Sequence, residues 1–71
     1  MGKGVREFSI RSIVKEAGGR EMLKNLGVKR AYDHFWKTFN YMATKAFEVG
    51  YSEIIEPDPT EVMDFLDNLI S

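Results

Sequence analysis

The chain has 71 residues, of which 44% are hydrophobic and 30% charged, and its formal net charge is −1. That composition fits one globular domain rather than a disordered chain, and the absence of cysteine, with a single histidine, excludes disulfides and a thiolate zinc site. No apolar run approaches the ~20 residues of a membrane span, so we expect no membrane partner. We also expect no metal and no cofactor.

The charges divide unevenly along the chain. Residues 1–30 have a net charge of +5 and residues 31–71 a net charge of −6. Such a split suggests two faces with different partners, or two halves that neutralise each other within a dimer.

The first expected helix runs from about Ser9 to Ala17. Residues 1–8 before it are predicted to be a mobile basic tail, and residues 9–71 to form the domain. Ile10, Ile13, Val14 and Ala17 have the spacing of one apolar helix face. Ser9 suits the N-cap, and the two glycines that follow Ala17 suit a stop.

Residues 19–27 are predicted to be a connection with a helical turn, and the central helix to run from Val28 to Val49. Apolar residues recur along this helix at alternating steps of four and three, as in a heptad seam. At 1.5 Å per residue it would reach ~33 Å. Two short helices would not cover so long a face, so we expect a second copy to bury it. The predicted dimer interface is Tyr32, Phe35, Trp36, Phe39, Met42, Ala46 and Phe47.

The last expected helix has a clear start. Ile54 and Ile55 favour a short extended segment before it. Asp58 suits the N-cap, with Pro59 in the first helical position and Glu61 in the third. The predicted order is therefore short helix, long helix, short helix, in an all-α fold.

Two segments, on this helix plan, resemble the histone fold. IRSIVKEAG over residues 10–18 is similar to the I-x-R-I-I-K-x-A-G pattern of the first helix in archaeal histones. GYSEIIEPD over residues 50–58 is similar to the G-R-x-x-I-x-E-P-D run in bacterial histone-fold proteins of unassigned function. The resemblance covers about residues 9–66. It implies a handshake dimer, in which two long helices cross and each first loop pairs with the partner's second loop.

The resemblance also implies binding to the phosphate backbone of duplex DNA, without sequence preference, by a homodimer or a histone-fold heterodimer. A nucleoid-associated, cytoplasmic protein would follow. The predicted DNA-binding residues are the basic ones of the first half: Lys3, Arg6, Arg11, Lys15, Arg20, Lys24, Lys29 and Arg30. The second loop reads Gly-Tyr-Ser-Glu from residue 50, where archaeal histones have Gly-Arg-Lys-Thr, which predicts weaker binding.

Two other interpretations stay open. One is a histone-fold subunit that docks another protein through its acidic half and does not bind DNA. The other is a three-helix helix-turn-helix domain, which the unequal helix lengths disfavour. No nucleophile–base pair, phosphate loop or spaced carboxylate pair is present, so we expect no enzyme activity and no small-molecule substrate. His34 is expected to face solvent.

Overall fold

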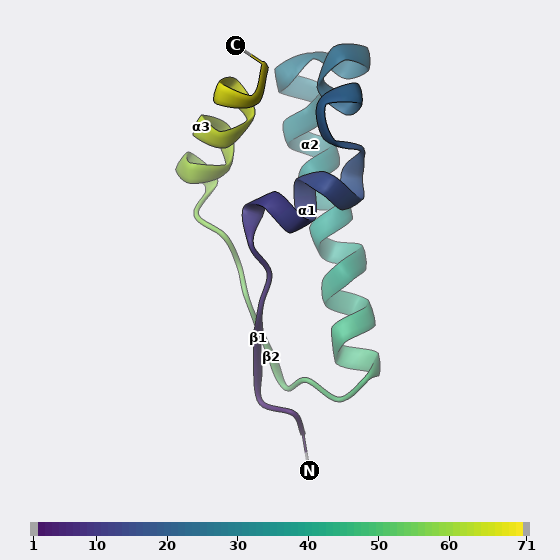
Figure 1. Cartoon of the computed structure of the whole chain (residues 1–71). Coiled ribbons are helices and arrows are strands. Elements are labelled where there is room, and N and C mark those ends of the chain that lie inside the picture. Colours follow the sequence, from purple (N-terminus) through teal and green to yellow (C-terminus); the bar gives the residue numbers. More distant parts are fainter. Residues whose placement is uncertain (1, 71) are drawn as a thin grey trace.

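The computed structural model describes residues 2–70 as three helices and two short strands (Figure 1). In chain order these are β1 (Val5–Glu7), α1 (Ile10–Ala17), α2 (Gly19–Glu48), β2 (Glu53–Ile55) and α3 (Pro59–Ile70). The predicted order of a short, a long and a short helix is confirmed.

Helix α1 begins and ends where the sequence predicts. The Ser9 side chain accepts a hydrogen bond from the backbone N–H of Ser12 at 3.1 Å, which satisfies one of the free donors of the first turn. Gly18 ends the helix with φ 127°, a conformation that favours glycine. Its N–H bonds the carbonyl of Val14 at 3.1 Å.

Helix α2 contains a break at Gly27. The backbone there has φ 81° and ψ 163°, so residues 19–26 and 28–48 are two helical segments joined at an angle. The predicted long helix from Val28 is confirmed and ends one residue earlier than expected. The segment before it forms a helix of two turns, where a connection with a single turn was expected.

Helix α3 begins as predicted. The Asp58 carboxylate accepts a hydrogen bond from the N–H of Thr60 at 2.8 Å, and Pro59 is the first helical residue. Val62 and Leu66, one turn apart, are fully buried against the rest of the chain. The cap therefore sets where α3 begins, and the spacing of its apolar residues sets which face is buried.

The expectation of a free N-terminal tail is wrong for residues 5–7. Strand β1 pairs in parallel with β2, with Val5 opposite Glu53 and Glu7 opposite Ile55. Two further backbone bonds extend the pairing, from the Lys3 N–H to the Gly50 carbonyl at 2.8 Å and from the Ser52 N–H to the Gly4 carbonyl at 2.9 Å. These bonds hold the segment against the loop that follows α2. We call the paired strands the β ribbon.

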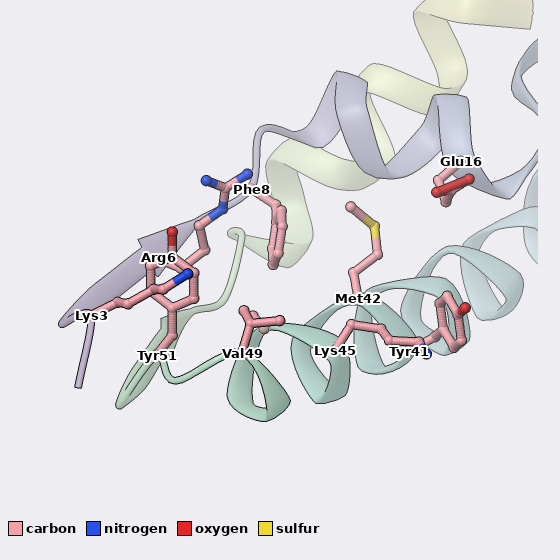
Figure 2. Close-up of a pocket in the computed structure, with 10 residues that line it drawn as sticks. Lys3, Arg6, Phe8, Glu16, Tyr41, Met42, Lys45, Val49 and Tyr51 are labelled. Carbon is pink, nitrogen blue, oxygen red and sulfur yellow. The ribbon is translucent and has the colours of Figure 1, made fainter. Parts of the chain in front are cut away.

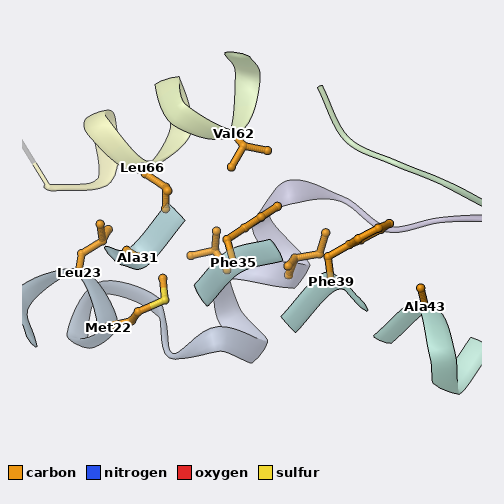
Figure 3. Close-up of a cluster of buried hydrophobic side chains, with 10 residues drawn as sticks. Met22, Leu23, Ala31, Phe35, Phe39, Ala43, Val62 and Leu66 are labelled. Carbon is orange, nitrogen blue, oxygen red and sulfur yellow. The ribbon is translucent and has the colours of Figure 1, made fainter. Parts of the chain in front are cut away.

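The core lies between α1, α3 and the part of α2 nearest to them (Figure 3). Its largest fully buried side chains are Ile13, Leu23, Phe35, Val62 and Leu66. The molecule is elongated, with extents of 44 × 19 × 14 Å. Below α1 and α3, only the β ribbon accompanies α2 (Figure 1). The fold therefore has a packed half and a sparsely covered half, which we call the ribbon half.

Candidate functional site

Four cationic side chains gather on the packed half. Arg11 and Lys15 lie one turn apart on α1, and Arg20 and Lys24 lie one turn apart on the first segment of α2; all four are exposed. Arg11, Lys15 and Arg20 line a hollow of about 290 Å³, and Arg20 and Lys24 line one of about 250 Å³. Because Arg20 and Leu69 border both hollows, the four cations form one surface, which we call the basic face.

No acidic side chain of the described residues forms an ion pair with the four cations of the basic face. Among residues 2–70 the only polar contact recorded for these four side chains runs from Arg20 Nε to the carbonyl of Leu69, at 3.3 Å. That carbonyl lies in the last turn of α3, where the helix macrodipole favours a cation. This contact uses only the Nε of Arg20, so the remaining N–H groups of its guanidinium and the other three cations can bind anions.

The remaining four residues of the predicted DNA-binding set lie elsewhere. Lys29 and Arg30 are exposed just after the break at Gly27, and they line neither hollow of the basic face. Lys3 and Arg6 lie on or beside β1 and border a separate hollow in the ribbon half, together with Lys45. The structure thus brings together half of the predicted set.

The seven residues of the predicted dimer interface differ in how far they are exposed within one chain. Phe35 and Phe39 are 0% and 3% exposed, so α1, α3 and the ribbon already cover them within one chain. The expectation that a second copy must cover them is wrong, because the short helices both pack on the same half of α2. Ala46 is also buried, whereas Phe47 is 51% exposed.

The other three seam residues, Tyr32, Trp36 and Met42, are half-buried. The Trp36 ring packs edge-to-face on Phe35 and Phe39, with centroids 5.1 and 5.7 Å away, and on Tyr32 at 6.1 Å. Tyr32, Trp36, Ala43 and Phe47 are spaced by four, seven and four residues, so they form one stripe on α2. We call it the aromatic stripe.

The ribbon half exposes most of the apolar surface. Of the six large apolar side chains that the described residues expose, five lie on β1 or β2, in the last two turns of α2, or just after it: Val5, Tyr41, Phe47, Val49 and Ile55. A hollow of about 350 Å³ opens beside the aromatic stripe, lined in part by Phe39, Ala43, Phe47 and Ile54. Concentrated exposed apolar surface typically marks an interaction site.

Features that indicate other functions are few. Within residues 2–70, no group of three or more His, Asp or Glu side chains is placed to hold a metal ion. His34 is exposed and borders a hollow with Glu16, Lys37, Thr38 and Tyr41. In the same part of the chain, no helix has both the length and the hydropathy to cross a bilayer.

Comparisons of the chain with protein-family models, with curated proteins and with solved structures found no match.

Proposed function

We propose that the chain forms a dimer that binds duplex DNA through the basic face, without sequence preference. The observation that carries this proposal is the contiguous surface of Arg11, Lys15, Arg20 and Lys24, with which no acidic side chain of the described residues forms an ion pair. Lys and Arg on one face are the electrostatic footprint that phosphate binding needs.

Phosphate contacts would dominate the affinity. The basic face offers long cationic side chains over an apolar floor that includes Phe65 and Leu69. Of residues 2–70, no amide side chain that would read a base edge lines either hollow. Four neutralised phosphates for each chain correspond to a salt slope of about −3.6 in log K against log salt. Both copies of a dimer acting together would double this value.

For the dimer, the aromatic stripe is the surface we propose. Trp36, Ala43 and Phe47 lie on one side of the second segment of α2 by their spacing, and Ala43 and Phe47 line a hollow that another side chain would fill. Two copies crossing there would resemble the long-helix crossing of the histone fold. The first-loop segment is helical here and β2 pairs with β1 of the same chain. We therefore assign the contact to the crossed helices rather than to loop-to-loop pairing.

A second candidate is a protein-interaction subunit that does not bind DNA. The observation that favours it is the set of exposed carboxylates that begins at β2 and continues along α3. Glu53 and Glu56 lie on or just after β2, and Glu61, Asp64 and Asp67 follow on α3. Each of these acids repels DNA that comes near it, and together they would attract a basic partner.

A gel shift with two unrelated duplexes of equal length distinguishes these functions. If the proposal is right, both duplexes shift at the same protein concentration in low salt, and both shifts disappear as salt rises. If neither duplex shifts at low salt, the protein-interaction function replaces the DNA proposal.

A further inference from the structure

A second hollow of the ribbon half lies between the β ribbon and the last turns of α2 (Figure 2). Lys45, which lines it, follows Ala43 of the aromatic stripe by two residues and so lies about half a turn away around the helix. The volume of the hollow is about 560 Å³, and its floor is apolar, made by Phe8, Met42, Ala46, Val49 and Tyr51. Lys3, Arg6 and Lys45 stand along its edges, and Glu16 is the only acid among its lining residues. We call this hollow the ribbon groove. None of the residues of the basic face lines it.

The three cations of the ribbon groove are held on its aromatic rings. The Arg6 guanidinium carbon lies 4.9 Å from the centroid of Phe8 and 5.8 Å from that of Tyr51. The Lys3 ammonium lies 5.6 Å from the Tyr51 ring, and the Lys45 ammonium 5.6 Å from the Tyr41 ring. These cation–π contacts place Lys3 and Arg6 over the aromatic part of the floor and Lys45 over Tyr41, so Met42, Ala46 and Val49 form its uncovered apolar part.

We propose that the ribbon groove binds an acidic amphipathic helix of another protein. The apolar face of such a helix would lie on Met42 and Val49, and its acidic flank would meet Lys3, Arg6 and Lys45. The groove follows α2 from Tyr41 to Val49, which is ~12 Å or about two helical turns. An apolar floor with cations at its edges is complementary to this ligand in both hydropathy and charge.

Two other occupants fit less well. Nucleic-acid bases would need free ring faces for stacking, and cations lie over the Phe8, Tyr51 and Tyr41 rings. The acidic helix α3 of a second copy carries suitable charges, but Val62 and Leu66 on its apolar face are fully buried in its own core. It therefore has no apolar face to offer while the chain stays folded.

The test uses the full chain and two fluorescein-labelled helical peptides of about four turns. One peptide has a Leu face flanked by Glu, and in its twin every Glu is Lys. The wild-type chain is expected to bind the acidic peptide at least about ten-fold more tightly than the twin, as measured by fluorescence anisotropy.

Charge reversal locates the site. Arg6→Glu with Lys45→Glu should weaken acidic-peptide binding by about ten-fold or more, whereas the matched pair Lys15→Glu with Lys24→Glu, on the basic face, should leave it nearly unchanged. Val49→Asn tests the apolar floor and should also weaken binding; Val49 is exposed, so the fold tolerates this change. Should the charge-reversed groove pair fail to fold by circular dichroism, Val49→Asn alone decides.

Three results would overturn the proposal. The first is equal binding of both peptides, and the second is an equal loss of binding in the two charge-reversed pairs. The third is that the acidic peptide and a second copy of the chain displace each other from the groove. The last result would assign the groove to a second copy. Because the basic-face pair should lose DNA without losing the peptide, failure of DNA binding and failure of the groove are distinguishable.

Discussion

Gly27 positions the basic face, because its backbone sets the angle between the two segments of α2. We therefore predict that Gly27→Ala destabilises the chain. At φ 81° and ψ 163° only glycine is comfortable, and holding alanine there costs about 1–3 kcal/mol. No atom lies within 4 Å of the added Cβ, so the cost is that of the backbone alone.

The variant has one other route, which is to straighten α2. Alanine in a continuous helix gains about 1 kcal/mol over glycine. Straightening would pull Met22 and Leu23, 5% and 1% exposed, out of the core, at about 1.5–3 kcal/mol each. Keeping the break is therefore the less costly route, with an expected loss of about 1–3 kcal/mol.

Thermal melts followed by far-UV circular dichroism, at equal protein concentration, measure this loss. For a domain of this size each kcal/mol lowers Tm by about 4–8 °C, so Gly27→Ala should melt roughly 4–24 °C below wild type. The exposed Asn25→Ala, two residues away, is the matched control and should melt at or slightly above the wild-type temperature. A Gly27→Ala variant as stable as wild type would mean that α2 runs straight through residue 27.

Three further predictions concern the capping, the core and the dimer. Asp58→Ala removes the acceptor of the Thr60 N–H and should cost about 0.5–2 kcal/mol in a urea melt; no change would place the start of α3 elsewhere. Leu66→Ala empties a fully buried position and should cost about 2–5 kcal/mol; a loss below about 1 kcal/mol would contradict the described core. Phe47→Glu, at an exposed position, should leave helix content intact and make the chain monomeric in light scattering. A dimer that survives Phe47→Glu would exclude the aromatic stripe as its interface.

Local signals in the sequence account for the helices. Ser9 and Asp58 each bond an N–H of the turn that follows, and these are the bonds that N-cap residues make in general. The helices are interrupted at Gly18 and Gly27, which both adopt positive φ. Glycine is the residue that favours this conformation, so its position in the sequence indicates where a helix can stop. The boundaries of α1, of α3 and of the segment of α2 after Gly27 depend on neighbours in the chain, so they were predictable; the helix over residues 19–26 was not predicted.

Long-range contacts account for what the sequence did not reveal. Strand β1 has three residues with two charges among them, and its partner β2 lies 48 residues away. No local pattern indicates that pairing, which brings Phe8 and Tyr51 to one groove with Met42 and Lys45. Likewise, periodicity marked Phe35 and Phe39 as one apolar face, but it did not indicate that α1 and α3 would cover both.

Each of the four residues of the basic face was predicted from the sequence as a DNA-binding residue. That all four lie on one surface was not predictable. Arg11 and Lys15 share a helix face by spacing alone. Arg20 and Lys24 join them only because residues 19–26 form a helix that folds back at Gly18, where φ is 127°. Lys45 was not predicted as a site residue, because its role depends on the β ribbon.

The salt dependence of DNA affinity tests the central claim most directly. Affinity for one duplex is measured by fluorescence anisotropy over a series of salt concentrations, for wild type, for Arg11→Gln with Lys15→Gln, and for the charge-matched control Lys37→Gln with Lys45→Gln. The basic-face pair should bind more weakly, with a salt slope shallower by about 1.8 per chain, while the control keeps the wild-type slope. Equal slopes in all three proteins, or no wild-type binding at low salt, would contradict the account.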